Sequence, residues 1–173
     1  MQEFIMSSFT GLVSGVVSSL LFFWFISMMR PKIELSGMIC TDVDPDGRFY
    51  AFKIINKTKY NLLDLRAEMI LKTPVNSNGG PNYTHRWLTI KKETYLLFPK
   101  YNLKDAKAEY ALVLGTREDL SSLWTDQAQF LQVKIHLKHS FSGISKSFVK
   151  EYYTKKSCVK EGMFNFGDSF EIS

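Results

Sequence analysis

Cysteine is scarce in this chain of 173 residues: only Cys40 and Cys158 occur, and they lie far apart. They form neither a CxxC pair nor a Cys/His spacing, so neither a disulfide framework nor a zinc site is indicated. The three histidines show no ligand-like spacing with carboxylates, and we expect no cofactor and no metal. The sequence also lacks a GxSxG, P-loop, HExxH or paired-carboxylate motif. These absences disfavour an enzyme.

Charge is absent from the N-terminal segment. No charged residue occurs between Phe4 and Met29. A helix of that length would extend about 39 Å, which exceeds the roughly 30 Å hydrocarbon core of a bilayer. A cleaved signal peptide would need a basic start and a small-residue cleavage site, and this stretch offers neither. We therefore expect residues 1–32 to form one transmembrane helix and a basic junction.

The charges that flank this segment predict its orientation. Arg30 and Lys32 follow the apolar run, whereas Glu3 is the only charged residue before it. Basic flanks favour the cytoplasmic side, so residues 33–173 are expected to form a cytoplasmic domain of a single-pass inner (plasma) membrane protein. The whole chain has 22 basic and 17 acidic side chains. This excess suits a membrane surface or a nucleic acid, although it is also ordinary for domains beside a membrane.

Small residues recur on one stripe of the expected helix, which consists of Ser7, Gly11, Ser14 and Ser18. Gly11 and Gly15 also form a GxxxG pattern, and small residues let helices pack closely in lipid. We expect the helix to self-associate, unless these residues are merely tolerated. In an oligomer the stripe would line a narrow pore, and Phe25 would form an apolar constriction near its cytoplasmic end.

Beyond residue 32, short stretches alternate between apolar and polar residues, which is typical of β-strands. The turn Asp44–Pro45–Asp46–Gly47 predicts a hairpin. The strands are expected at Ile33–Cys40, Phe49–Asn56, Leu63–Lys72, Trp87–Lys91, Tyr95–Phe98, Tyr110–Leu114, Phe130–His139, Ser147–Tyr153, Val159–Phe166 and Phe170–Ile172.

Two segments depart from this pattern. A short helix is predicted over Arg117–Trp124, with Thr116 and Asp119 in an N-terminal capping arrangement. The polar segment Thr73–Asn82 is rich in glycine and asparagine, and we expect it to be a mobile surface loop.

Basic residues suggest two places where an anionic ligand could bind. One group adjoins the expected loop and consists of His85, Arg86, Lys91 and Lys92. The other is the polar side of one strand, which carries Lys134, His136 and Lys138 and alternates with apolar residues. Such groups can contact phosphates, but a solubilising loop and a solvated sheet face remain the simpler explanations.

Several short motifs, in this order, resemble the cytoplasmic domain of inward-rectifier potassium channels. They are Arg30–Pro31–Lys32, Ile33–Glu34–Leu35, Phe52–Lys57, Leu65–Met69, Val149–Tyr153 and Gly162–Phe170. The resemblance implies an all-β immunoglobulin-like sandwich after one transmembrane α-helix, a homotetramer, and Arg30 and Lys32 beside lipid phosphates. The chain lacks the first transmembrane helix, the pore helix and the Thr-Val-Gly-Tyr-Gly filter of that family, so potassium selectivity is not implied.

The arrangement of one helix and a sensor domain also resembles membrane effectors of bacterial anti-phage defence, in particular the Hailong type. That resemblance implies an oligomeric channel governed by a single-stranded DNA oligomer or a nucleotide bound to the cytoplasmic domain. The alternative is a membrane-anchored module that does not conduct ions and recruits a protein partner.

Overall fold

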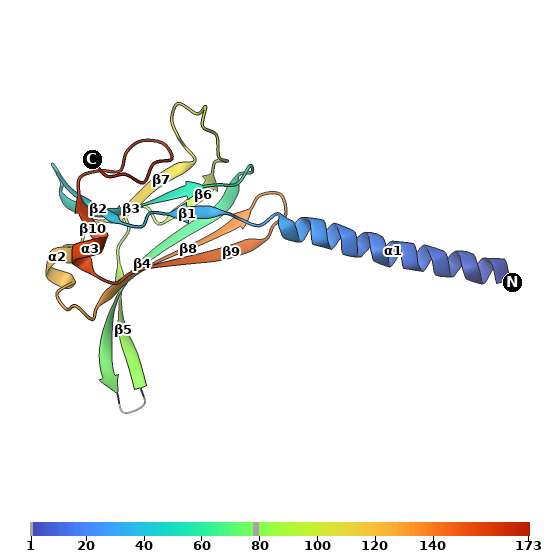
Figure 1. Cartoon of the computed structure of the whole chain (residues 1–173), viewed down its shortest axis with the longest axis horizontal. Helices are drawn as coiled ribbons and strands as arrows, with labels where there is room; N and C mark the ends of the chain where they lie inside the picture. The colour runs from blue at the N-terminus through green and yellow to red at the C-terminus, as the bar shows by residue number, and fades with distance from the viewer. Residues whose placement is uncertain (1, 78–79) are drawn as a thin grey trace.

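The computed structural model describes residues 2–77 and 80–173, and it consists of one long helix followed by a β domain (Figure 1). Helix α1 spans Gln2–Met28 and extends away from the domain along the long axis of the molecule. Within it, Met6–Met28 has a mean hydropathy of 1.9, and none of this segment is buried. The helix is therefore long and apolar enough to cross a membrane, as the sequence predicted.

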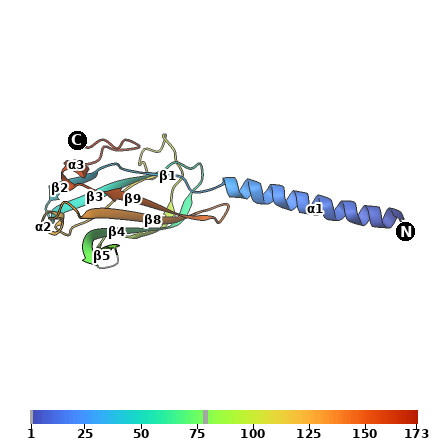
Figure 2. The same cartoon turned by 60° about the horizontal axis from the view of Figure 1, so that its bottom comes forward.

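The β domain has two layers, which Figure 2 shows in edge view. Sheet A runs β1-β3-β2-β10, and β7 pairs with the other edge of β3. Its strands are β1 (Ile33–Leu35), β2 (Ile39–Asp44), β3 (Gly47–Asn56), β7 (Ala111–Thr116) and β10 (Val159–Glu161). Sheet B runs β5-β4-β8-β9, and β6 also pairs with β4. Its strands are β4 (Leu62–Ser77), β5 (Gly80–Leu88), β6 (Thr94–Phe98), β8 (Phe130–His139) and β9 (Ser145–Tyr152).

Alternation along the strands places the core between the two sheets. In β8 every second side chain, from Leu131 to Leu137, is fully buried, while Lys134 and His136 are exposed. The facing layer contributes Phe52 and Ile54 of β3 to the same apolar cluster. Burying one face of each sheet is what makes the period-two pattern specify a two-layer domain.

Two predicted elements are shorter than expected. The strand expected at Ile33–Cys40 is two strands, β1 and β2, which pair with different parts of β3 and are separated at Ser36–Met38. The Ser36 backbone bonds instead with Lys53 and Tyr152. The helix expected at Arg117–Trp124 is limited to α2 (Leu120–Leu123); Asp119 caps it by accepting a hydrogen bond from the amide of Ser121.

The prediction of a mobile loop over Thr73–Asn82 is wrong for the residues that the structure describes. β4 and β5 pair from Met69↔Leu88 to Ser77↔Gly80. Beyond Lys72, where the pairing of β4 with β8 ends, they continue as a two-stranded antiparallel arm that projects beyond the sandwich (Figure 1). Positions 78 and 79 lie outside the described residues. Backbone pairing between β4 and β5 holds this polar segment as strands. Its sequence lacks the alternation of apolar and polar residues by which a strand is predicted.

Of the two strands predicted at Val159–Phe166 and Phe170–Ile172, only the part at Val159–Glu161 forms a strand, β10. After β10 and the short helix α3 (Lys155–Cys158), residues 162–173 form a strap over the outer face of sheet A, closed by an isolated bridge between Phe164 and Ile172. The strap is held by Lys53, which is only 2% exposed. Its Nζ donates hydrogen bonds of 2.6 and 2.8 Å to the carbonyls of Asn165 and Ser169.

Helix α1 and the sandwich are joined by residues 29–32, and this junction is bonded to the domain. The hydroxyl of Ser142, in the turn between β8 and β9, donates a 2.7 Å hydrogen bond to the Met29 carbonyl. The Lys57 amide donates to the Lys32 carbonyl at 2.9 Å. Pro31, which lies between Met29 and Lys32 in the sequence, is buried. The end of the helix is thus fixed to two turns of the sandwich.

Candidate anion-binding site

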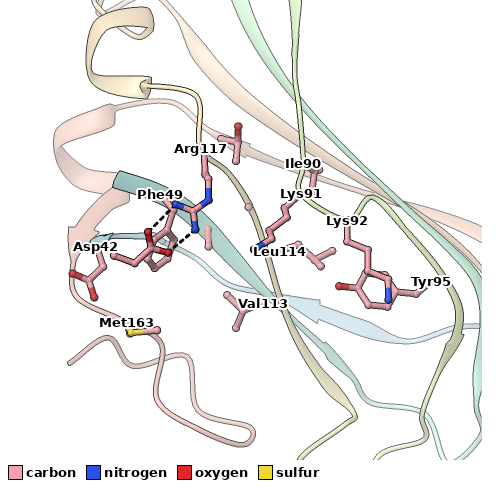
Figure 3. Close-up of a pocket in the computed structure, with 14 residues that line it drawn as sticks. Asp42, Phe49, Ile90, Lys91, Lys92, Tyr95, Val113, Leu114, Arg117 and Met163 are labelled. Carbon is pink, nitrogen blue, oxygen red and sulfur yellow. Dashed lines mark hydrogen bonds and ion pairs between the residues drawn. The ribbon is translucent and has the colours of Figure 1, made fainter. Parts of the chain in front are cut away.

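A cleft of about 340 Å³ opens on the outer side of sheet A, where the link between β5 and β6 passes over β7 (Figure 3). Its floor is apolar and is made by Phe49 and Val113, and one end is closed by Met163 of the C-terminal strap. The charged side chains around it are Asp42, Asp44, Lys91, Lys92 and Arg117. A concave apolar surface with a few polar groups at its rim is the usual form of a small-ligand site.

Backbone bonds fix the two lysines of this cleft. Ile90 forms an isolated bridge with Thr116, and the Lys91 amide donates to the Gly115 carbonyl at 3.2 Å. The link between β5 and β6 is therefore held against β7. This places both lysine side chains at the cleft, with Lys91 extending beside Arg117 and Lys92 beside Tyr95 (Figure 3).

Neither lysine forms an ion pair with a carboxylate of the described residues. Among the residues that the structure describes, the ion pairs involve other basic side chains, namely Lys57, Arg86 and Arg117. The ammonium of Lys92 lies 4.3 Å from the centre of the Tyr95 ring, a cation–π contact that positions it without cancelling its charge. Burial raises the pKa of Tyr95, so its phenol is a neutral hydrogen-bond donor at neutral pH.

Arg117 is the third cation of the cleft, and it is already paired. Its guanidinium donates to both carboxylate oxygens of Asp44, at 2.8 and 2.5 Å, and lies 3.4 Å from Asp46. The hydrogen bond with Arg117 lowers the pKa of Asp44, and Lys91 adds a smaller lowering. The pair is solvent-exposed, so it shapes the cleft wall more than it stabilises the fold.

The cleft thus combines the ammonium groups of Lys91 and Lys92, the aromatic ring of Tyr95 and an apolar floor. The carboxylate of Asp42 lies at its rim. The ammonium groups can bind a phosphate or carboxylate, and the ring and floor can cover a planar or apolar part of the same ligand. The carboxylates exclude a ligand that is anionic over its whole length. The arrangement fits a small molecule with one anionic end.

The predicted ligand-binding residues are divided among three places rather than brought together. Lys91 and Lys92 lie in the cleft, whereas Lys134, His136 and Lys138 lie on the outer face of sheet B, together with His85. Arg86 points to the opposite side of β5 from His85 and forms an exposed 3.5 Å ion pair with Glu118. Register explains the split, because neighbouring residues of a strand face opposite ways.

The predicted helix residues lie along α1 with exposed side chains: Ser7, Gly11, Ser14, Gly15, Ser18 and Phe25. Several other hydroxyls of the helix bond to the preceding turn; Thr10 donates to Met6 and Ser19 to Gly15, both at 2.8 Å. Within the described part of the chain, the hydroxyls of Ser14 and Ser18 have no such partner. They remain available to a neighbouring helix or to water.

Sequence reasoning missed most of the cleft. Asp42, Phe49, Tyr95 and Arg117 come from different strands and loops, and no spacing in the sequence relates them. One signal was present: Phe49 and Ala51 are apolar on the side of β3 opposite to its core residues. A strand with apolar residues on both faces indicates that another segment of the chain or a ligand covers its outer face.

Comparisons with known proteins assign no family. No family model matches the chain, and no curated protein is similar to it in sequence. Among solved structures, a Bordetella pertussis structural-genomics target, BeR40, described as an ApaA protein, is similar at a TM-score of 0.36 and 12% identity, covering 71% of this chain and 92% of that one. Structural-genomics target SoR45 is similar at a TM-score of 0.35 and 16% identity, covering 70% and 83%. At these scores neither likeness bears on function.

Proposed function

We propose that this protein is a homo-oligomeric membrane channel, with four copies as the expected assembly, whose domain binds an anionic nucleotide or oligonucleotide that shifts the channel between closed and open states. The domain is an immunoglobulin-like sandwich of the inward-rectifier type and lies in the cytoplasm beneath the inner membrane. The physiological role is anti-phage defence, in line with the resemblance to Hailong-type effectors.

The observation that carries the ligand half of the proposal is the pair of unneutralised ammonium groups at Lys91 and Lys92 above an apolar floor. A phosphate would bind these groups, and a base would lie over Phe49 and Val113 in the 340 Å³ cleft. A ligand moves a conformational equilibrium only if it binds one state more tightly. The cleft supports this because its wall includes Met163, which belongs to a separate segment, the C-terminal strap.

The channel half of the proposal is supported by helix α1. The helix is fully exposed, and a side chain added at Gly11 or Gly15 would meet nothing within 4 Å in the single chain. Small residues with open space beside them, together with the unpartnered hydroxyls of Ser14 and Ser18, suit close contact between copies of the helix.

The test is ionic conductance of the full-length chain in a planar bilayer, with and without a nucleoside monophosphate in one experiment and a short single-stranded DNA in another. Discrete current steps altered by one of these signals are expected. Because the space beside Gly11 is open, Gly11→Leu leaves the single chain undisturbed and is expected to abolish the steps by obstructing contact between helices. Val16→Leu, on the opposite side of the helix, is the matched control and is expected to conduct.

The cleft is tested by Lys91→Glu/Lys92→Glu, which is expected to retain conductance and lose the response to the nucleoside monophosphate. Lys104→Glu/Lys107→Glu makes the same charge change in an exposed loop and is expected to respond normally. A silent bilayer, with insertion and oligomerisation demonstrated, would refute the channel and favour the membrane-anchored interaction module. An unchanged response in the Lys91→Glu/Lys92→Glu variant would remove the cleft as the binding site.

A further inference from the structure

The outer face of sheet B carries exposed aromatic and basic side chains, and it lies in a different layer from the cleft. Strand register places three aromatic side chains of β5 on this face, Tyr83, His85 and Trp87, opposite Pro74, Lys72 and Ile70 of β4. Trp87 is 62% exposed, although it is the largest side chain of the strand. An exposed tryptophan within a contiguous group calls for a binding partner, whereas a scattered apolar residue does not.

The aromatic rings form a row across the strands. Tyr83 of β5 meets Phe130 of β8 edge to face, with ring centres 5.4 Å apart, and Phe130 meets Tyr153, just after β9, at 5.4 Å. Tyr153 is 61% exposed and its hydroxyl donates to Glu151, which holds the ring in place. The rings are therefore ordered by the sheet and still open to solvent.

Basic side chains lie beside these rings on the same face. The ammonium of Lys72 lies 5.6 Å from the centre of the Phe130 ring. Arg66 and His136 are paired across β4 and β8, and Lys134 and Lys138 follow on β8. Four carboxylates lie near them: Glu68, opposite Lys134; Glu151, which accepts hydrogen bonds from Gln132 and Tyr153; and Asp64 and Glu93, which line a pocket with Arg66 and Glu68. Lys72 is the cation that lies directly at the aromatic rings.

We propose that this surface, here called the aromatic face and defined by Trp87, Tyr83, Tyr153, Lys72, Lys134 and Arg66, binds a single-stranded nucleic acid. Bases would stack on the exposed rings, and phosphates would lie along the basic side chains of β4 and β8. Stacking on ordered rings beside a line of cations is the chemistry by which proteins hold single strands without reading sequence. Phe130 to Lys138 spans about 26 Å at roughly 3.3 Å per residue, which accommodates several nucleotides.

A nucleic acid suits this face better than a second copy of the chain. A contact between copies would bury the exposed rings against other apolar groups, and it would leave Arg66, Lys72 and Lys134 near like charges of a basic partner. A phosphate backbone supplies the opposite charge. The inference rests on the proposed function for the class of the signal, but it concerns a different surface and does not require a channel.

The experiment measures fluorescence anisotropy of a labelled oligothymidine, about 12 nucleotides long and within the ~4–16 nucleotides that one such domain covers, with the full-length protein in detergent. Trp87→Ala and Tyr153→Ala are each expected to weaken binding about 5- to 150-fold, the range for losing one base–aromatic stack. Phe166→Ala removes an exposed ring from the strap on the other layer and is expected to bind as the wild type does.

Salt dependence provides a second readout. For single strands the slope of log affinity against log salt concentration is about −0.7 per phosphate contact, so Lys72→Ala/Lys134→Ala is expected to reduce its magnitude by about 1.4. Lys91→Ala/Lys92→Ala in the cleft is expected to leave the slope unchanged. All of these positions are on the surface, so the variants should fold.

The outcomes separate this inference from the proposed function. Absence of strand binding, or binding that Trp87→Ala and Tyr153→Ala leave intact, overturns the aromatic face. If the same two variants instead change the mass of the oligomer, the face is an interface between copies and the inference is equally overturned. Aromatic-dependent binding together with a silent bilayer would retain the aromatic face and refute the channel. A current that is controlled through Lys91 and Lys92, without any strand binding, would support the channel and overturn the aromatic face.

Discussion

The buried lysine under the C-terminal strap offers a sharp test of how the strap is held. Lys53→Met retains the length and apolar stem of the side chain and removes the ammonium group. That group makes two hydrogen bonds, at 2.6 and 2.8 Å, to the carbonyls of Asn165 and Ser169. The rest of the strap contacts the domain through apolar side chains, such as Ile172, and through backbone bonds, such as the one from the Gly162 amide to the Thr41 carbonyl.

The expected cost follows from two opposing effects. A hydrogen bond from a charged group contributes about 1.5–3 kcal/mol, and Lys53 makes two of them. Burial of the ammonium works against this, and desolvation accordingly lowers the pKa of Lys53, with a partial opposing effect from Asp168. The released carbonyls can bond to water. We therefore expect a net loss of about 2 kcal/mol, which corresponds to about a 30-fold increase in local opening of the strap.

Hydrogen exchange followed by mass spectrometry measures this opening directly. The amides of residues 162–173 are expected to exchange about 30-fold faster in Lys53→Met, while those of β4 and β8 change little. Lys160→Met is the matched control, since Lys160 makes only one hydrogen bond of this kind, to the Ile172 carbonyl at 2.8 Å, in the described part of the chain. It should have a smaller effect. Wild-type exchange of the strap in Lys53→Met would show that the ammonium does not hold it.

Two further predictions concern the cleft wall. Gly115→Ala would place a Cβ 2.2 Å from the carbonyl oxygen of Tyr50, so β7 must move away from β3, and a loss of about 3 kcal/mol in the free energy of unfolding is expected by urea titration. Asp44→Asn should destabilise the domain slightly at neutral pH and not at all in acid. Because Arg117 lowers the pKa of Asp44 from its ordinary 3.8, the unfolded carboxyl takes up protons first as the pH falls, and its stabilising effect is lost as the pH drops through the folded value. A difference between Asp44→Asn and wild type that grows on acidification would contradict this.

Local patterning was sufficient to predict most of the strands. The alternation of Val133, Ile135 and Leu137 with polar residues placed β8 correctly, and the turn at Asp44–Gly47 placed the hairpin of β2 and β3, with Gly47 at a φ of +113°. The β4–β5 arm was missed because its sequence is polar and because its two strands, which pair only with each other beyond Lys72, bury no stripe of apolar residues there. Propensity could not indicate such pairing, which depends on the partner strand.

The candidate site could be predicted only in part, for a related reason. Lys91 and Lys92 were identified because basic residues are visible in a sequence. Tyr95 and Arg117 lie beside them only because the β5–β6 link pairs with the end of β7. The aromatic face was likewise invisible. Its rings come from β5, β8 and the end of β9, and only the register of the sheet places them side by side.

The bonded junction at residues 29–32 has a mechanical consequence. A flexible linker would let the sandwich rotate independently of α1, and movements of the sandwich would not be transmitted to the helix. Here the Met29 carbonyl accepts a hydrogen bond from the Ser142 hydroxyl, and the Lys32 carbonyl accepts one from the Lys57 amide. The helix and the sandwich are therefore expected to move together. Rotation of the sandwich by a few degrees would therefore turn the helix about its own axis. The stiffness of residues 29–32 would then determine how much of this rotation is passed to α1.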